Sequence, residues 1–500
     1  MKKAIAMLAV LLLLTGCQSK QPTVEQAPAK QEEEKIEGVL ITLSEEGVNV
    51  QGDEDGAVYT ANDIIYYPEG EDFTFGEGTE EDTHEAAEAE AHTVVHITKP
   101  GTYTLTGTLP AGQIAVDLGD DAEDDPNAVV TLVLDNADIT CSVAPAVIFY
   151  NVYECGDKDD PTKDVDTSEA GANVVLAEGS VNRVTGSYVA RIYKEGTVEL
   201  SEDDTEVEDA EKLHKYDAAF YSKMSMNVDG EGELHITAEN EGLDSEMHLT
   251  INGGAIYIRS GNDGINTNED GVSVTTINGG LVDIVVTGET GEGDGIDSNG
   301  WLVINGGEVR ASACATSQDA GIDSDMGIHI NGGTVAASGH MLDRIEEGGQ
   351  TYAVFSFTEP QTGGEEYIIK DAEGKTVLTA SPENAFSTLI VSGKLTEGEY
   401  SLYRGDLQLS VAEGGLGGME PRPAPPKGTE HPEPPEGMPE PPEGMTPPDG
   451  MQMPEGELPE GMTPPAGGFG GQRPMERLNI GEASPIFTLK KGENYFIVVQ

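Results

Sequence analysis

The sequence predicts an all-β fold, a single-stranded parallel β-helix with a C-terminal antiparallel β module and disordered acidic and Pro-rich segments. The first observation is an Asn-Gly-Gly motif that recurs at intervals of 26, 27 and 26 residues. The second is that alternating apolar strands flank each motif, such as Leu249-Thr250-Ile251 before the first one and Ile256 with Ile258 after it. The third is a further apolar position in each repeat, at Leu243, Ile265, Ile296 and Ile322.

Each repeat has the length of one coil of a parallel β-helix. The motifs begin at Asn252, Asn278, Asn305 and Asn331. Gly supplies the positive φ angles at the turns, and each Asn can hydrogen-bond to the Asn one coil away. A β-propeller is excluded because its blades contain about 40 residues or more. We therefore predict that residues 38–339 form the β-helix, with acidic insertions.

The C-terminal third of the chain has other patterns. Short apolar runs over residues 340–415 are typical of antiparallel strands and predict a small β module. Residues 416–476 repeat Pro, Glu, Gly and Met, a composition that cannot form a core, and predict a disordered segment. Residues 477–500 contain two more apolar runs, which predict closing strands.

The N-terminus predicts export from the cytoplasm. Lys2 and Lys3 precede an apolar run, residues 4–14, that is short for a stable membrane anchor. The run ends in Leu14-Thr15-Gly16-Cys17, which resembles the lipobox of bacterial lipoproteins. We expect residues 1–16 to be a signal peptide, Cys17 to carry a lipid and residues 17–37 to be a disordered tether. The expected location is extracytoplasmic, at the cell surface, with a lipid anchor in the membrane.

Composition narrows the function further. The 500 residues include 92 Asp and Glu but only 27 Lys and Arg, which gives a formal net charge of −65. A phosphate backbone requires clustered cations, so this balance excludes a nucleic-acid-binding protein. Besides Cys17 there are three cysteines: a bridge between Cys141 and Cys155 remains open, and Cys314 is expected to be a small buried apolar side chain.

Acidic and amide side chains recur in phase with the coils. Coils that stack about 4.8 Å apart bring such groups together. Two unit charges about 5 Å apart repel by roughly 3 kcal/mol at an effective dielectric constant near 20. Ca²⁺ would remove this repulsion because it binds about six to eight oxygen ligands. The candidate ligands are Asp244, Glu246, Asp263, Asn266, Asp294, Asp297, Asp323 and Asp325.

The alternative to a metal site is that these acidic turns are solvated. Asp and Asn would then be present only because they cap turns.

Side chains beside the repeated strands indicate where a sugar could bind. A sugar ring can stack on an aromatic side chain, and the guanidinium of Arg can pair with a uronate carboxylate. The candidates are Tyr257, Arg259, Trp301 and Arg310. For Trp301, the only tryptophan, the alternative is a half-buried position at a strand edge.

Several segments together resemble a known bacterial family, the carbohydrate-binding domain-containing proteins. They are residues 103–109 and 132–140, the Asp263-Gly264-Ile265 turn and the Asn-Gly-Gly repeats, and the resemblance covers roughly residues 38–414. It implies a right-handed parallel β-helix with a shape like that of polysaccharide lyases, and Ca²⁺ bound on the helix. It also implies non-catalytic binding of plant cell-wall polysaccharide, either cellulose or polygalacturonate-like. Asp263, Asp294 and Asp297 match the family's turns, whereas Asn266 replaces an acid.

We therefore expect a surface-anchored lipoprotein that binds polysaccharide without catalysis and is stabilised by Ca²⁺. One alternative is a Ca²⁺-dependent, pectate-lyase-like enzyme, for which Arg259 and Arg310 are the basic candidates on the strands after the motifs. The other is a structural surface spacer. The sequence does not specify the polysaccharide, the number of metal sites or the oligomeric state.

Overall fold

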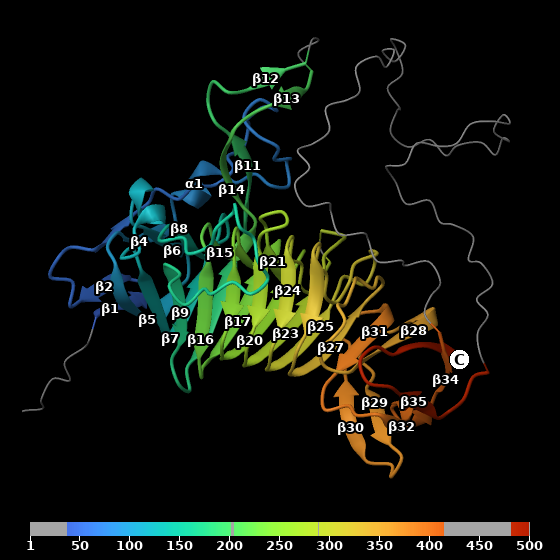
Figure 1. Ribbon diagram of the computed structural model, residues 1–500. Helices are drawn as coiled ribbons and strands as arrows, with labels where there is room; N and C mark the ends of the chain where they lie inside the picture. The colour runs from blue at the N-terminus through green and yellow to red at the C-terminus, as the bar shows by residue number, and fades with distance from the viewer. Residues whose placement is uncertain (1–37, 202–204, 289, 415–481, 500) are drawn as a thin grey trace, which may run out of the picture. The chain divides into compact units, whose positions relative to one another are not determined.

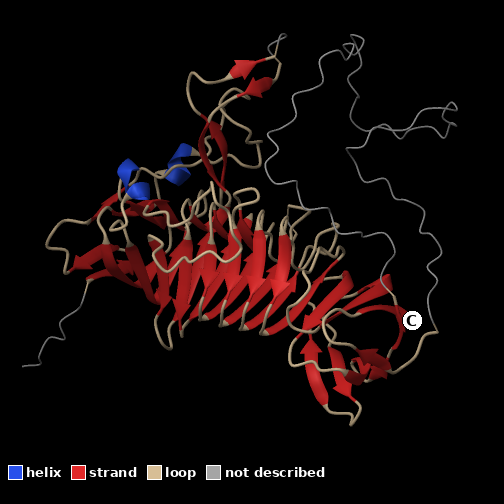
Figure 2. Ribbon diagram, viewed as in Figure 1, coloured by secondary structure: helices blue, strands red, loops and turns tan. Residues whose placement is uncertain are grey.

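The computed structural model describes residues 38–201, 205–288, 290–414 and 482–499 (Figure 1). These residues form an almost entirely β structure, in which the helical segments are the short α1 (Ala86–Ala89) and the 3-10 helix η1 (Asp120–Asp124) (Figure 2). The prediction of an all-β chain is confirmed. No helix in the described part of the chain combines the length and the apolar character that a membrane span requires. The predicted signal peptide (1–16), Cys17, the tether (17–37) and the low-complexity segment (416–476) lie outside the described residues.

The repeats form successive coils that contribute in turn to three parallel stacks of strands. One coil consists of β19 (Leu249–Ile251), β20 (Ala255–Ser260) and β21 (Ile265–Thr267). One coil later, β22 (Val274–Ile277) pairs with β19 in parallel, so that Leu249 lies opposite Thr275. The chain therefore returns to the same stack after 26 residues, which is the spacing of the Asn-Gly-Gly motifs.

The first stack pairs its strands in parallel from its first member to its last. In spatial order it contains β1 (Val39–Ser44), β5 (Gly101–Leu109), β7 (Val130–Thr140), β9 (Ala172–Leu176), β16 (Met226–Gly230), β19, β22, β24 (Trp301–Ile304) and β26 (Gly327–Ile330). At its N-terminal edge, β2 (Gly47–Gln51) pairs with β1 in the antiparallel direction.

The second and third stacks carry the other sides of the coils. The second contains β10 (Val181–Gly186), β17 (Glu233–Ala238), β20, β23 (Leu281–Val286), β25 (Glu308–Ser312) and β27 (Thr334–Gly339). The third contains β3 (Val58–Ala61), β4 (Thr93–Ile97), β6 (Gly112–Asp117), β8 (Val147–Asn151), β15 (Ala218–Ser222), β18 (Glu241–Ser245) and β21. Only the β3–β4 pair of these stacks is antiparallel.

Apolar ladders fill the interior between the stacks. Ile256, Val282, Val309 and Val335 are in register on adjacent strands, and each is 0% exposed. Thr275 is the exception in an aliphatic ladder. Its buried hydroxyl lies 3.1 Å from the Thr267 hydroxyl, which lies 2.8 Å from that of Ser298. This departure from the repeat is therefore compensated by hydrogen bonds between hydroxyls.

The Asn-Gly-Gly motifs form one corner of the coils. Asn278, Asn305 and Asn331 each donate an Nδ2 hydrogen bond of 2.9 Å to the Oδ1 of the preceding Asn in the series. Gly254 at this corner has φ +83°, a conformation that favours Gly over residues with a Cβ atom. The amide ladder predicted from the repeat is thus present.

Two acidic insertions that the sequence predicts to be disordered are structured in their described residues. Strand β11 (Val189–Tyr193) pairs with β14 (Lys212–Tyr216), and β12 (Glu199–Leu200) pairs with β13 (Val207–Asp209). We call these four strands, β11 to β14, the arm. The ion pair of Lys194 with Glu211 and the buried ring of Tyr216 contribute to holding it. Residues 156–170 likewise contact the stacks through Lys158, which pairs with Glu269, and through Thr167. Paired charges and a few buried side chains therefore override the acidic composition.

The C-terminal strands close the end of the coils and form a second core. Strand β31 (Phe386–Ser392) pairs antiparallel with both β27 and β28 (Tyr352–Gln361). Aromatic side chains including Phe355, Phe386 and Phe496 pack in this core. The remaining strands are β29 (Tyr367–Asp371), β30 (Thr376–Ala380), β32 (Gly398–Arg404), β33 (Leu407–Gln408), β34 (Ser410–Glu413), β35 (Phe487–Leu489) and β36 (Tyr495–Val499). One pair departs from the predicted antiparallel pattern, because β28 and β36 run parallel.

No disulfide joins the three cysteines of the described residues. Cys141 and Cys314 are buried free thiols, and Cys155 is a half-buried one.

Candidate functional site

The predicted acidic positions stack in phase along the third stack. Asp244 lies opposite Asn266 in the pairing of β18 with β21. The backbone N–H of Asp297 donates to the Ile265 carbonyl at 2.8 Å, and that of Asp323 donates to the Ile296 carbonyl at 2.7 Å. These bonds continue the register, so Asp244, Asn266, Asp297 and Asp323 form one ladder. We call it the acidic ladder.

The N-terminal half of the acidic ladder has partners within the protein. Asn268 donates to both carboxylate oxygens of Asp244, at 2.9 and 3.0 Å. Lys212 pairs with Glu246 at 3.0 Å, and the hydroxyl of Tyr221 also donates to Glu246. Burial and then repulsion from Asp217 raise the pKa of Asp244 well above its usual value. Asp244 and Glu246, two of the predicted metal ligands, are thus held by amide, ammonium and hydroxyl groups.

Lys215 strengthens this arrangement from a position that the sequence prediction missed. Its ammonium lies 2.7 Å from the carboxylate of Asp217, one coil before Glu241. Lys212 and Lys215 both come from β14 of the arm, which belongs to a segment that reads as an acidic insertion. These two cations lie beside the acidic ladder only because the chain folds back through β14.

The C-terminal half brings three carboxylates together. Oxygens of Asp294, Asp297 and Asp323 all lie within 4.8 Å of one another. Within the described residues neither Asp294 nor Asp297 forms an ion pair with Lys, Arg or His. Burial and then repulsion from Asp263 raise the pKa of Asp294 to about 9. Burial and then repulsion from Asp325 raise the pKa of Asp297 to about 6.

Asp263 belongs to a neighbouring row of acids. Its carboxylate accepts a 2.6 Å hydrogen bond from the backbone N–H of Asp294, and the carboxylate of Asp294 accepts one of 2.5 Å from Ala320. Burial and then repulsion from Asp297 raise the pKa of Asp263 to about 8. Each acid therefore ties its coil to the next one while it remains close to other carboxylates. Asp325, in contrast, is exposed.

Two buried oxygens near these acids have no hydrogen-bond partner among the described residues. They are Oδ1 of Asn266 and Oε2 of Glu241, although Asn266 Nδ2 donates to Oε1 of Glu241 at 3.2 Å. Asn266 is 7% exposed and lies in the acidic ladder between Asp244 and Asp297. A buried acceptor without a donor is costly, and a cation would satisfy it.

The donor set fits Ca²⁺. All the ligand atoms are oxygens, which hard divalent cations prefer. Ligands placed about 2.3–2.6 Å from Ca²⁺ lie at most about 5 Å apart across the ion. The mutual distances within 4.8 Å among Asp294, Asp297 and Asp323 meet this limit.

Three of the four predicted sugar contacts lie together on the outer face of the second stack, where Arg259 and Arg310 both pair with Asp283, and only Trp301 lies apart. Tyr257 on β20 stacks on the ring of His235, with centroids 4.7 Å apart. Arg259 pairs with Glu383 at 3.1 Å, and Arg310 pairs with Glu308 at 2.6 Å. Trp301 is half-buried on β24 of the first stack, whereas the other three residues lie on the second stack. Both guanidinium groups already have carboxylate partners.

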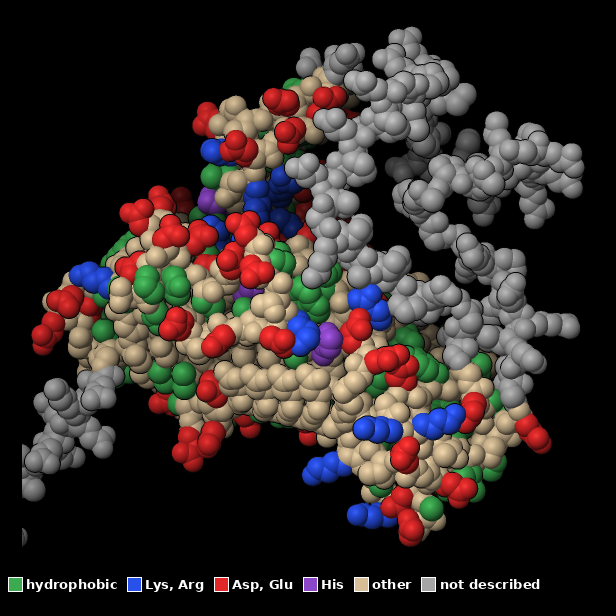
Figure 3. Space-filling model, viewed as in Figure 1, with side chains coloured by type: hydrophobic (Ala, Val, Ile, Leu, Met, Phe, Trp, Pro, Cys, Tyr) green, Lys and Arg blue, Asp and Glu red, His purple; other side chains and the backbone are tan. Residues whose placement is uncertain are grey.

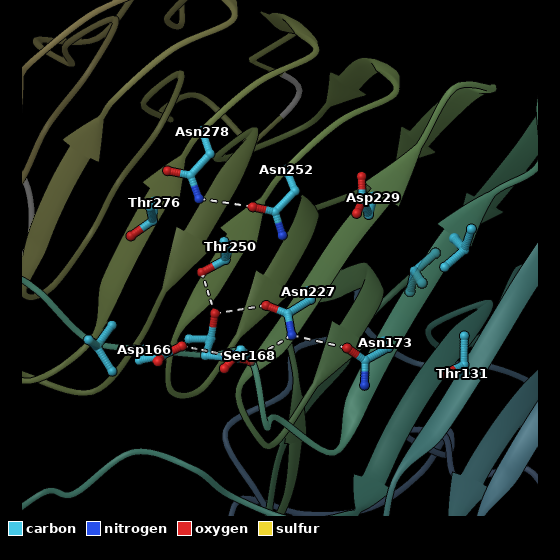
Figure 4. Close-up of a pocket in the computed structure, with 14 residues that line it drawn as sticks. Thr131, Asp166, Ser168, Asn173, Asn227, Asp229, Thr250, Asn252, Thr276 and Asn278 are labelled. Atoms are coloured by element: carbon cyan, nitrogen blue, oxygen red, sulfur yellow. Dashed lines mark hydrogen bonds between the residues drawn. The ribbon is translucent and has the colours of Figure 1, made fainter.

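A groove on the outer face of the first stack contains none of these predicted residues. Its volume is about 460 Å³, and it is lined by outward side chains of β9, β16, β19 and β22 and by residues 165–168, which we call the strap. Figure 4 shows Asn227, Thr250 and Thr276 along neighbouring strands, with Asp166 and Ser168 of the strap beside them. The repeat places Thr250 and Thr276 at the outward position of the first two motif strands, but only the fold adds the strap and Asn173.

Acidic groups are spread over the face seen in Figure 3, whereas basic groups are few. This distribution agrees with the formal charge of −65.

Comparison with known proteins identifies a relative with a similar sequence and a solved structure with a similar chain. A relative from Acetivibrio thermocellus, described as a carbohydrate-binding domain-containing protein, is 31% identical over 167 residues. The match covers 33% of this chain and 45% of the relative, so the chain spans about half the length of the curated relative that it matches. Among solved structures, the polysaccharide lyase-like protein from C. thermocellum, in a gadolinium derivative, is 21% identical with a TM-score of 0.34. That match covers 59% of this chain and 83% of the other.

A family match covers a larger part of the chain. Residues 91–156 and 155–352 match the family described as carbohydrate-binding domain-containing protein. These ranges include the acidic ladder, the Asn-Gly-Gly corner and the groove, and they amount to more than half of the 500 residues. The chain therefore belongs to the carbohydrate-binding domain-containing protein family.

Proposed function

We propose that this protein binds extracellular, plant cell-wall polysaccharide without catalysing its breakdown. Membership of the carbohydrate-binding domain-containing family supports the binding function. The lipobox-like sequence ending at Cys17 supports export and a lipid anchor, which would hold the protein at the cell surface.

The proposed scaffold is a right-handed parallel β-helix. Its support is the parallel, in-register pairing of three stacks, to which each coil contributes in turn. Such a scaffold presents equivalent side chains at the regular spacing of about 4.8 Å between strands, which suits a ligand with its own repeat.

We also propose that Ca²⁺ stabilises the coils at Asp294, Asp297 and Asp323. The observation that carries this part is the approach of their half-buried carboxylate oxygens to within 4.8 Å of one another. Oδ1 of Asn266, which has no hydrogen-bond partner among the described residues and lies one coil away from Asp297, is a second, independent indication of a cation. The metal would neutralise the repulsion there, while Asn266 and Asp263 would support the ligands.

The state of the two predicted basic candidates supports the non-catalytic role. A lyase requires a base that accepts a proton from carbon next to the uronate carboxyl. Arg259 and Arg310 are ion-paired with Glu383 and Glu308, and a guanidinium remains protonated in proteins. Neither arginine is therefore suited to take up a proton.

Incubation of the purified mature protein with polygalacturonate and with insoluble cellulose, in the presence of Ca²⁺, tests the proposal. We expect co-sedimentation or gel retardation without release of unsaturated sugar, which absorbs in the ultraviolet. Appearance of that absorbance would establish the lyase. Absence of binding to any cell-wall polysaccharide would favour the spacer.

A further inference from the structure

The groove on the first stack has a regular polar floor. Asn173 on β9, Asn227 on β16, Thr250 on β19 and Thr276 on β22 occupy successive in-register positions on the outer face. Each coil therefore contributes one hydroxyl or amide group, at the strand spacing of about 4.8 Å. This spacing is comparable to the length of one hexose unit in an extended glycan.

The strap fixes one side of the floor. The hydroxyl of Thr167 donates to Asn227 Oδ1 at 2.8 Å, and its oxygen lies 2.7 Å from Thr250 Oγ1, whose proton it can accept. Asn227 Nδ2 donates to the Thr167 carbonyl at 2.7 Å and to Asn173 Oδ1 at 3.0 Å. Figure 4 shows this network as a continuous line of contacts. Asn227 and Thr250 are therefore buried by the strap and bonded to it, and this network fixes the strap along one side of the groove.

The opposite side of the groove keeps unused hydrogen-bonding capacity. Asn252 and Asn278 of the corner ladder line it, and each amide in that ladder uses only part of its four hydrogen-bonding positions. The hydroxyl of Thr276 forms no hydrogen bond to another described residue. These groups can donate to and accept from sugar hydroxyls.

The charge of the lining specifies the class of ligand. None of the described residues that line the groove is Lys, Arg or His, and its charged members are Asp166 and Asp229. A uronate polymer would bring carboxylates toward these two acids without a cation to pair with. A neutral sugar chain meets no such repulsion.

We propose that this groove binds a neutral polysaccharide chain beside the strap, through the accessible groups of Asn252, Thr276 and Asn278. The inference rests on the proposed polysaccharide-binding function and adds the site and the class of substrate. The groove volume of about 460 Å³ lies within the usual range of about 300–1,000 Å³ for ligand sites. Hydrogen bonds, rather than aromatic stacking, provide the contacts.

Affinity gel electrophoresis and calorimetry test the site with the mature protein, xyloglucan and cellohexaose as neutral ligands, and polygalacturonate as the acidic one. The variants are Thr276→Val, which removes the free hydroxyl, and Asn278→Ala. The matched control is Asn305→Ala, which also breaks two ladder bonds but removes a side chain that does not line the groove and leaves the amide of Asn278 in place. We expect each groove variant to weaken neutral-glycan binding by about threefold to tenfold, the effect of losing one or two hydrogen bonds, and the control to bind like the parent.

The outcomes separate this inference from the proposed function. Neutral-glycan binding that is equal in all variants would overturn the site but leave the function intact. Binding of polygalacturonate alone would overturn the neutral class, again leaving the function intact. Binding of no polysaccharide by the folded parent would overturn both. Unchanged circular dichroism spectra of the variants establish that any loss is local.

Discussion

Asp297 and Asp323 are equivalent residues on adjacent coils, and their carboxylates share one half-buried cluster with Asp294. The backbone N–H groups of Asp297 and Asp323 donate to Ile265 and Ile296, which sets the register, and the carboxylate oxygens then lie within 4.8 Å. The backbone hydrogen bonds that build the stack thus impose the carboxylate contact.

Asp297→Asn should have opposite effects with and without Ca²⁺. With a chelator the variant should melt higher than the parent, because one negative charge of the cluster is removed. With Ca²⁺ it should melt lower, because a ligand is lost; a metal at 100 times its Kd contributes about 2.7 kcal/mol. Differential scanning calorimetry in both conditions measures this change of sign.

Asp406→Asn is the matched control, because Asp406 is an exposed acid of the C-terminal strands and lies outside the cluster of three. It should respond to Ca²⁺ like the parent. Equal melting of the parent with Ca²⁺ and with chelator would contradict the metal site.

Asn266→Asp should make the protein more dependent on Ca²⁺. The new carboxylate would lie between Asp244 and Asp297, and at about 5 Å the added repulsion is roughly 3 kcal/mol per neighbour at an effective dielectric constant near 20. The variant also loses the amide donor to Glu241. We expect the difference in melting temperature between Ca²⁺ and chelator to exceed that of the parent, and a smaller difference would argue against a metal beside this position.

Much of the fold was accessible from the sequence because the repeat is local. The Asn-Gly-Gly spacing gives the coil length, and the alternation around Ile256 and Ile258 gives the buried face. The parallel β28–β36 pair was not accessible, because about 130 residues separate these strands and no repeat relates them. The sequence did not reveal that the acidic insertions are structured, because composition does not identify ion-pair partners such as Glu211 for Lys194.

The acidic ladder was predicted as a row, but its division into two halves was not. The phase of Asp244, Asn266, Asp297 and Asp323 follows from repeat length alone. The neutralisation of one half depends on Lys212 and Lys215, which reach it through a separate antiparallel arm. Long-range contacts of this kind leave no periodic signal.

Acid should destabilise the protein through His248. This side chain is 2% exposed, its Nδ1 accepts the Val274 N–H at 3.1 Å, and burial lowers its pKa from 6.5 to about 4. A lowered pKa in the folded state means that stability is complete above pH 6.5 and is lost as the pH falls toward 4, because the unfolded chain takes up the proton first. The difference corresponds to about 3 kcal/mol.

His248→Asn keeps an acceptor near Nδ1 and should remove this part of the acid sensitivity. Chemical denaturation at pH 4.5 and pH 7 measures it as the difference between variant and parent. His235→Asn, at a ring that is 39% exposed, is the control. The same loss of stability in the parent and in His248→Asn would exclude this histidine as the cause.

Gly264→Ala should damage both the stack and its response to Ca²⁺. An added Cβ would lie 2.2 Å from a methyl carbon of Ile284 and 2.6 Å from the carbonyl oxygen of Gly295 on the next coil. The backbone oxygen cannot move aside without separating the coils, so we expect a loss of about 1–3 kcal/mol or more. Gly393→Ala, whose nearest neighbour would be a side-chain carbon at 3.3 Å, is the control and should cost little.

Because Gly264 follows Asp263 and contacts the residue after Asp294, separated coils would also pull the carboxylates apart. The Ca²⁺-dependent rise in melting temperature should therefore shrink in Gly264→Ala and remain in Gly393→Ala, and an undiminished rise in Gly264→Ala would show that the metal does not depend on close stacking of these coils.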